Sequence, residues 1–193
     1  MKSKDDNDRR IFIGVPVLLE PDFIKDFSIL KNDLRKNKIS WVKNHLMHIT
    51  IRFIGDISQD KVMKLKDDFV RFTIDDKFDL NTGGIGVFES NRIPKVIYVN
   101  VIYHAPWIKL NSEVNKMLEK YNIASSDKQF TPHLTLGRVR LIKDSRSFQL
   151  IKNKFQPGFK LKQKDLRLCL YQSILTNDGP VYEILKSVPL INL

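Results

Sequence analysis

Two short stretches of this sequence decide its fold: His48-Ile49-Thr50-Ile51 and His133-Leu134-Thr135-Leu136. Both have the pattern His-aliphatic-Thr-aliphatic, and they start 85 positions apart (133 minus 48). In a β-strand, residues i and i+2 point to the same face. Each stretch therefore predicts a strand with an imidazole and a hydroxyl on one face and aliphatic packing on the other. With four histidines in 193 residues, chance predicts about 0.1 His-x-Thr matches, so two matches at this offset are informative.

The same offset brings other parts of the chain into correspondence. Ile11-Phe12-Ile13 falls on Val96-Ile97-Tyr98, and both runs are β-branched or aromatic, as in buried strands. Pro21 falls on Pro106, each at the start of a helix-like stretch where proline is tolerated. The chain is therefore expected to contain an internal repeat in which each half forms a strand, a helix and a strand bearing His-x-Thr.

Apolar residues at helical spacing predict four helices, at roughly Pro21–Lys36, Ser58–Phe72, Pro106–Tyr121 and Ser147–Phe155. Further strands are expected at Phe78–Val87, Leu166–Ser173 and Val181–Ser187, with Asn177-Asp178-Gly179-Pro180 as the turn of a terminal hairpin. The expected fold is α+β: two pseudo-symmetric lobes of antiparallel sheet, with outer helices, around a central cleft. Residues 10–193 are expected to form one bilobal domain after a flexible leader at residues 1–9.

Composition favours a nucleic-acid partner. The chain has 33 Lys+Arg against 22 Asp+Glu, a net charge of +11 that attracts phosphate polyanions. A lysine-rich surface kept for solubility is the alternative. There is no apolar run of the roughly 20 residues that a membrane span needs, and no signal-peptide core. A single cysteine, Cys169, cannot form an internal disulfide. A cytoplasmic protein without a membrane partner is expected.

If the two lobes are related by a pseudo-twofold axis, His48 and His133 face each other across it. Such a pair suits hydrolysis of a 2′,3′-cyclic phosphate, which needs one base to activate water and one acid to protonate the departing ribose oxygen. Histidine titrates near neutrality and can do either. The hydroxyls of Thr50 and Thr135 would hold the non-bridging phosphate oxygens. This scheme requires no metal and no other cofactor. The alternative is that both histidines are structural strand residues copied by duplication.

The paired motif resembles the signature of the 2H phosphoesterase superfamily, two tetrapeptides of the form His-hydrophobic-Thr/Ser-hydrophobic. Flanking residues resemble its RNA 2′,3′-cyclic phosphodiesterase, or 2′-5′ RNA ligase-like, branch. The resemblance runs from about Arg10 to Pro189. It rests on the two motifs with their flanks and on three further segments: Arg10-Ile11-Phe12-Ile13-Gly14, Leu170-Tyr171-Gln172-Ser173 and Tyr182-Glu183-Ile184-Leu185.

This resemblance implies metal-independent hydrolysis of RNA 2′,3′-cyclic phosphate ends to 2′-phosphomonoesters. The expected partner is RNA with such ends, and tRNA fragments are an open alternative among them. It also implies that reversible 2′-5′ ligation is open to the enzyme, and a monomer is expected. His48 and His133 would be the acid–base pair, with His48 expected as the acid and His133 as the base. Arg138 matches a basic position of the branch. Gly137, just before it, departs from the branch's pattern and is expected to alter the shape of the groove.

Other residues have weaker signals. Arg52 lies two residues beyond Thr50 and would share its face if the strand stays regular, where it is expected to bind phosphate. Arg138 is out of phase with the second motif, so that only a twist or a bulge returns it to the site. Phe130 is a candidate for stacking on a base, with core packing as the alternative. His45 and His48 form His-x-x-His, but no carboxylate or cysteine cluster accompanies them and no metal site is expected.

Two other functions remain open at this point. One is a phosphodiesterase for 2′-5′ oligonucleotides or small cyclic nucleotides, because specificity lies in loops that the sequence does not place. The other is a non-catalytic RNA-binding module, although both motifs keep His and Thr. Charge-driven binding alone would show strongly salt-dependent affinity without chemistry.

Overall fold

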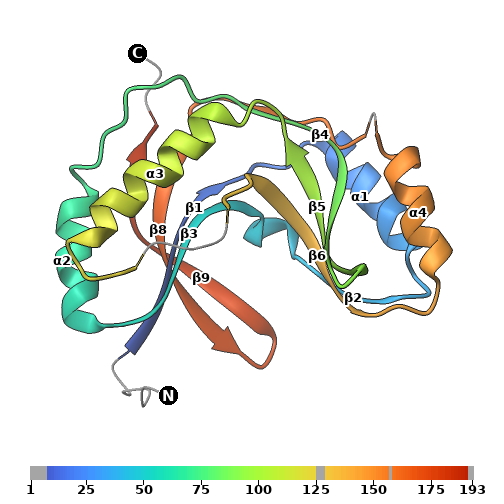
Figure 1. Ribbon diagram of the computed structural model, residues 1–193, viewed down its shortest axis with the longest axis horizontal. Coiled ribbons are helices and arrows are strands. Elements are labelled where there is room, and N and C mark those ends of the chain that lie inside the picture. Colours follow the sequence, from blue (N-terminus) through green and yellow to red (C-terminus); the bar gives the residue numbers. More distant parts are fainter. Residues whose placement is uncertain (1–7, 125–128, 157, 191–193) are drawn as a thin grey trace.

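The computed structural model describes residues 8–124, 129–156 and 158–190 (Figure 1). Four helices lie within these ranges: α1 (Pro21–Asp33), α2 (Gln59–Phe69), α3 (Ala105–Glu119) and α4 (Ser145–Lys154). A 3-10 turn, η1 (Asn44–Leu46), precedes the first motif. The strands are β1 (Asp8–Pro16), β2 (Lys38–Trp41), β3 (His48–Ser58), β4 (Leu80–Ser90), β5 (Ile93–Val101), β6 (His133–Leu141), β7 (Lys162–Gln163), β8 (Arg167–Thr176) and β9 (Gly179–Pro189).

The strands form a curled antiparallel sheet that divides into two lobes. The order along the sheet is β7-β4-β5-β6-β3-β1-β8-β9, with β2 also on β6. β3 and β6 join the lobes through one registered pair, Ile49 opposite Leu134. From there the two strands diverge, as Figure 1 shows. The expected α+β architecture of two pseudo-symmetric lobes is confirmed.

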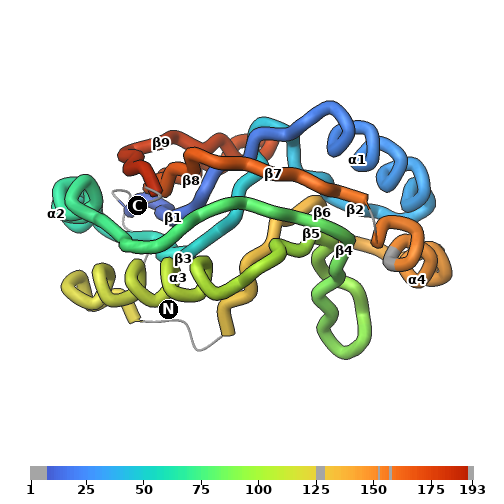
Figure 2. The backbone as a smooth tube through the Cα atoms, turned by 90° about the horizontal axis from the view of Figure 1, so that it is seen from above, coloured from blue at the N-terminus to red at the C-terminus, as the bar shows by residue number. Residues whose placement is uncertain are grey.

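The two halves of the sequence are interleaved. β1 and β3 share a lobe with β8 and β9, whereas β2 and β4 share the other lobe with β5, β6 and β7. Figure 2 shows α1 and α4 at one end of the molecule and α2 and α3 toward the other. The helix α1, which follows β1, therefore covers the lobe that does not contain β1, and α3, which follows β5, covers the lobe that does not contain β5. A single continuous cluster of buried side chains runs through both lobes. Neither half of the sequence therefore forms a lobe by itself.

The elements follow the sequence closely, with three differences. β2, which contains Trp41, and the two-residue β7 were not among the expected strands. Asp8 and Arg9 belong to β1 rather than to a flexible leader, of which residues 1–7 lie outside the described part. The first strands of the two halves correspond at an offset of 84 rather than 85, because Pro16 lies opposite His48 and Asn100 opposite His133. The terminal hairpin forms as expected, and Gly179 adopts φ +110° at its turn.

Within the described residues, no helix is both long enough and apolar enough to cross a membrane.

Candidate active site

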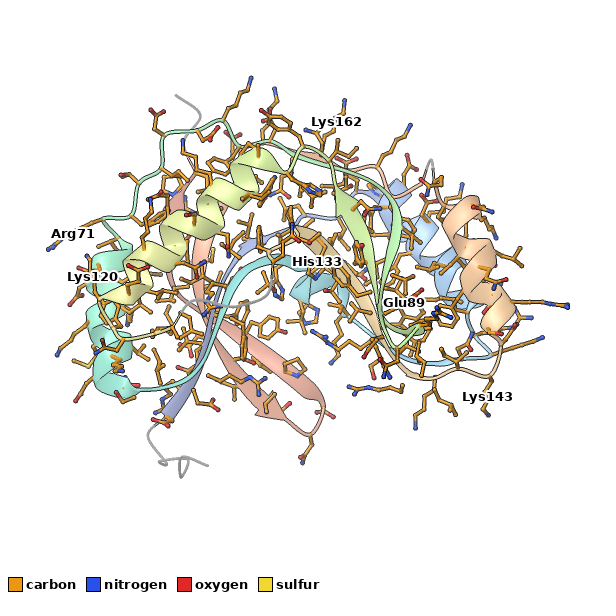
Figure 3. All side chains as sticks on the ribbon, viewed as in Figure 1. Arg71, Glu89, Lys120, His133, Lys143 and Lys162 are labelled. Carbon is orange, nitrogen blue, oxygen red and sulfur yellow. The ribbon has the colours of Figure 1, made fainter. Side chains whose placement is uncertain are left out.

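The two His-x-Thr motifs meet where the lobes join. In an antiparallel pair centred on Ile49 and Leu134, the neighbouring residues come opposite each other, so His48 faces Thr135 and Thr50 faces His133. Ile49 and Leu134 are fully buried. The four polar side chains therefore share the opposite face of the two strands, in the arrangement that a pseudo-twofold axis requires. Figure 3 shows His133 near the centre of the molecule, between the lobes.

Each imidazole is held by the same backbone contact. Nδ1 of His48 lies 2.7 Å from the carbonyl oxygen of Leu46, and Nδ1 of His133 lies 2.7 Å from that of Thr131. A carbonyl only accepts a hydrogen bond, so each Nδ1 carries the proton and donates it. In the neutral ring, Nε2 is then left as the basic nitrogen. Both histidines are thus presented with the same nitrogen available for proton transfer.

Aromatic rings surround His48. The centroids of Phe12 and Tyr182 lie 4.9 Å and 5.3 Å from that of the imidazole, with Tyr182 edge-on. Behind them Tyr171 stacks on Phe12 at 4.7 Å. These contacts restrict the tilt of the ring and remove it from water.

His133 has a corresponding aromatic environment built from different elements. Phe88 of β4 and Tyr98 of β5 lie edge-on to the imidazole, at centroid distances of 4.9 Å and 5.3 Å. Phe88 and Tyr98 stack on each other at 4.1 Å. The sequence pattern did not point to either ring as part of the site, because their pairing with His133 depends on long-range strand register.

The electrostatics of the two histidines are coupled. Burial is the main cause that lowers the pKa of both His48 and His133, and the hydrogen bond to a backbone carbonyl partly opposes it. The positive charge of Arg138 lowers the pKa of both rings further. The charge of His133 also lowers the pKa of His48. The charge of Arg138 therefore influences the protonation of both imidazoles.

A β-bulge brings Arg138 to this face. Where β6 pairs with β5, the ladder passes from Thr135 to Gly137 and skips Leu136. The alternation of side chains changes phase there. Arg138 therefore returns to the side of Thr135, and its effect on both histidines agrees with this position. The bulge required for this arrangement is present.

Gly137 is needed for packing. A Cβ on Gly137 would lie 2.7 Å from Cε3 of Trp41 and 2.8 Å from Cγ2 of Ile39. The departure from the branch's pattern thus makes room for β2 against β6. It lies on the buried side of the strand rather than in the groove.

Arg52 does not join the site, and the expectation that it shares the face of His48 is wrong. The ladder between β1 and β3 skips Ile51, so that Arg52 lies opposite Ile13, whose side chain belongs to the buried core. The guanidinium of Arg52 donates to the backbone carbonyl of Ala124. Because β3 is not regular at this point, the spacing of two residues beyond Thr50 does not give the same face.

Arg10 is a further basic residue that the sequence did not single out. The charges of Arg138 on β6 and Arg10 on β1 both lower the pKa of Tyr182, against the dominant effect of burial, which raises it. Guanidinium groups from the two lobes therefore flank this tyrosine. The guanidinium of Arg10 also lies 5.0 Å from the ring centroid of Phe53, which is about half exposed.

The remaining candidates have ordinary surroundings. The half-buried ring of Phe130 packs against the hydrophobic core, which was the alternative to base stacking. The hydroxyls of Thr50 and Thr135 have no hydrogen-bond partner among the described side chains and backbone groups, which leaves them able to donate to a ligand. The described residues contain no group of three or more His, Cys, Asp and Glu that could hold a metal ion.

This fold, with two His-Thr pairs on facing strands of two lobes, is the arrangement that the resemblance to 2H phosphoesterases implies. The sequence profile of the LigT like Phosphoesterase family matches residues 18–98. The RNA 2′,3′-cyclic phosphodiesterase of Archaeoglobus fulgidus is 28% identical over 180 residues, covering 92% of this chain and 98% of the relative. The protein of the same name from Methanocaldococcus jannaschii is 24% identical over 178 residues, with 92% and 98% covered. The chain is therefore similar to LigT-like phosphoesterases over residues 18–98 and to these two relatives over most of its length.

Solved structures show the same fold. Escherichia coli LigT complexed with 3′-AMP superposes with a TM-score of 0.74 at 19% identity, covering 95% of this chain and 98% of that one. A protein of Thermus thermophilus, TT0787, superposes with a TM-score of 0.71 at 21% identity and the same coverage. At these identities the likeness concerns the fold alone.

Proposed function

We propose that this protein hydrolyses 2′,3′-cyclic phosphate ends of RNA to 2′-phosphomonoesters, with His48 and His133 as the acid–base pair and without a metal. The observation that carries the proposal is the paired geometry of the two imidazoles. Each is fixed through Nδ1 by a carbonyl two residues earlier, and each lies across from the threonine of the other motif. The names of the relatives in Archaeoglobus and Methanocaldococcus support the choice of substrate.

The reaction needs only groups that the site provides. The cyclic phosphate lies between the imidazoles, and the hydroxyls of Thr50 and Thr135 donate to its non-bridging oxygens. Arg138 counters the negative charge that grows on these oxygens during attack. One imidazole takes a proton from water as the new P–O bond forms. The other gives a proton to the ribose O3′ as the P–O3′ bond breaks, which leaves a 2′-phosphomonoester.

The surroundings of the two rings favour His48 as the base and His133 as the acid, the reverse of the roles expected from the sequence. Three aromatic rings surround His48 and two flank His133, so burial disfavours the charged form of His48 more strongly. The repulsion between two protonated rings is mutual and favours a single proton on the pair. When the pair holds a single proton, that proton is therefore assigned to His133. The neutral His48 then accepts the proton of water.

The decisive assay uses a short RNA that ends in a 2′,3′-cyclic phosphate, in the presence of EDTA. The wild type should convert it to a 2′-phosphate, and His48→Ala and His133→Ala should each lose about 10²- to 10⁴-fold in rate. Circular dichroism checks that both variants fold. A folded wild type that is inactive in EDTA but active with added divalent cations would refute the metal-free scheme.

The acid and base roles can be separated with a substrate in which sulfur replaces the ribose O3′. A thiolate leaves without protonation, so this substrate should restore much of the rate to the variant that lacks the acid. Rescue of His133→Ala but not of His48→Ala supports the proposed roles. Rescue of His48→Ala alone would reverse them.

We infer that the protein acts in the cytoplasm as a monomer, with tRNA fragments among its RNA substrates, consistent with its net charge of +11. The same steps, with the 5′-hydroxyl of a second RNA in place of water, would form a 2′-5′ linkage as the P–O3′ bond breaks. A panel of cyclic-phosphate RNA, 2′-5′ oligonucleotides and small cyclic nucleotides ranks these substrates by kcat/KM. A non-catalytic RNA-binding role would require that none of them is turned over.

A further inference from the structure

A pocket of about 290 Å³ adjoins His48 and is not used by the proton transfers described above. One wall is the segment from Lys43 to Met47, which includes η1 and leads into the first motif. The other wall is the tip of the β8–β9 hairpin, which Figure 1 shows reaching out from the lobe. Since His48 itself lines the pocket, the space is continuous with the catalytic site.

The hairpin wall is apolar although it faces solvent. Val181 and Ile184 line the pocket, yet they are 51% and 54% exposed. Tyr182, which lies edge-on to His48, lines it as well. The start of β9 thus presents apolar side chains that the core does not cover. A flat apolar group bound in the pocket would remove them from water.

The opposite wall supplies polar groups. Lys43 and His45 line the pocket, and Nζ of Lys43 donates to the carbonyl oxygen of Asp178 across it at 3.3 Å. This bond links the loop to the hairpin tip and holds the two walls together. The imidazole of His45 is exposed and lines the same wall of the pocket, where its two ring nitrogens can form hydrogen bonds.

Apolar faces with polar groups at the edge match a nucleobase. A base has two apolar faces, and its edge carries donors and acceptors. The volume of about 290 Å³ is near the lower end for small-ligand pockets. The base of the terminal nucleotide is attached to the ribose that carries the cyclic phosphate, so it must lie within one sugar of His48. The pocket adjoins that residue.

We propose that the pocket between the Lys43–Met47 segment and the tip of the β8–β9 hairpin binds the base of the nucleotide that carries the cyclic phosphate. Val181, Ile184 and Tyr182 contact the base, and Lys43 and His45 meet its polar edge. The inference rests on the proposed function for the position of the phosphate. It adds that the enzyme recognises a nucleoside rather than the cyclic phosphate alone.

The test compares adenosine 2′,3′-cyclic phosphate with methyl riboside 2′,3′-cyclic phosphate, which lacks a base. The wild type should prefer the nucleotide by about 10- to 100-fold in kcat/KM. Val181→Trp fills the pocket from an exposed position and should reduce the rate on the nucleotide to that on the riboside. The ratio of kcat/KM on the nucleotide to kcat/KM on the riboside should therefore fall to about one in this variant. Ile184→Trp is a second filling variant, and Leu150→Trp, at an exposed site on α4, is the matched control.

The outcomes separate the inference from the proposed function. Equal rates on both substrates in the wild type would overturn the pocket's role while leaving the chemistry intact. A base preference that appears only when a second nucleotide is added would place a different base in the pocket and also overturn the inference. If neither substrate is hydrolysed, the proposed function fails. Calorimetric binding of adenosine 2′-phosphate against methyl riboside 2-phosphate, in wild type and Val181→Trp, then decides the pocket by itself.

Discussion

Gly14 on β1 lies directly beneath His48. A Cβ on Gly14 would be 3.2 Å from Cδ2 of the imidazole and 2.9 Å from the carbonyl oxygen of Ile49. Gly14 lies opposite Thr50 in the ladder, on the face that carries the motif. The absence of a side chain at this position therefore makes the space that His48 occupies.

We expect Gly14→Ala to lower kcat by about 10- to 100-fold, because the methyl group must move the imidazole or separate β1 from β3. The fold should survive, since the change adds one methyl group at the edge of the site. Steady-state kinetics, with circular dichroism as a check, measures the effect. Gly83→Ala is the matched control: its nearest contact is the end of the Ile102 side chain at 3.3 Å, and it should keep wild-type kcat. Equal losses in both variants would argue against a specific effect on His48.

The contrast between Arg52 and Arg138 shows how far the sequence determines the site. Local spacing correctly placed the histidines and threonines, because i and i+2 share a face over so short a run. The same spacing rule does not hold beyond the motifs, because each strand skips one residue of its ladder there. A skipped residue turns Arg52 to the buried face and returns Arg138 to the cleft. Bulges depend on partner strands far away in sequence, so a single-strand pattern does not reveal them.

The same reasoning applies to the wider fold. Helices and the terminal hairpin have local signals: apolar periodicity and the turn at Gly179. No local signal predicts that α1 and α3 each cover the lobe that does not contain the preceding strand, because this arrangement depends on how the two similar halves assemble. The aromatic rings around the histidines were missed for this reason as well. Glycine within a strand is one local signal of close approach, as at Gly14 beneath His48 and at Gly86 against Tyr98.

The two arginines should behave differently when replaced. Arg138→Ala removes a charge that acts on both histidines and should lower kcat/KM by about 10- to 100-fold. Arg52→Ala should leave kcat within about threefold of wild type, because the guanidinium bonds to the carbonyl of Ala124 instead. The same cyclic-phosphate assay compares them. A larger kinetic loss in Arg52→Ala than in Arg138→Ala would contradict the positions described here.

Asn37 should matter for stability and not for catalysis. Its amide nitrogen donates to the Ser147 hydroxyl at 3.0 Å, and its oxygen accepts from the backbone N–H groups of Lys143 and Asp144. It thereby ties the start of α4 to the segment that precedes β2. Because the side chain is buried, Asn37→Ala leaves these partners unsatisfied and should lower the free energy of unfolding by about 1–3 kcal/mol.

Urea unfolding of Asn37→Ala measures this loss, and kcat should stay at the wild-type value. Asn32→Ala is the matched control, since its side chain bonds only to the exposed guanidinium of Arg35 among the described groups. It should change the free energy of unfolding by less than about 0.5 kcal/mol. A loss in Asn32→Ala as large as in Asn37→Ala would rule out the network as the cause.

The lowered pKa values of His48 and His133 make stability depend on pH. In the unfolded chain both titrate near their ordinary pKa of 6.5, whereas burial keeps them neutral to lower pH in the folded protein. Below pH 6.5 the unfolded chain therefore binds more protons. The free energy of unfolding should fall as pH decreases below this value, and this contribution should level off beneath the folded-state pKa values.

Urea unfolding at pH 8 and pH 5 tests this for wild type and for the double variant His48→Gln/His133→Gln. The variant lacks both titrating rings, so its loss of stability between the two pH values should be smaller than that of the wild type. Contributions from carboxylates are common to both proteins and cancel in the comparison. If the double variant loses as much stability as the wild type, His48 and His133 are not held neutral by burial.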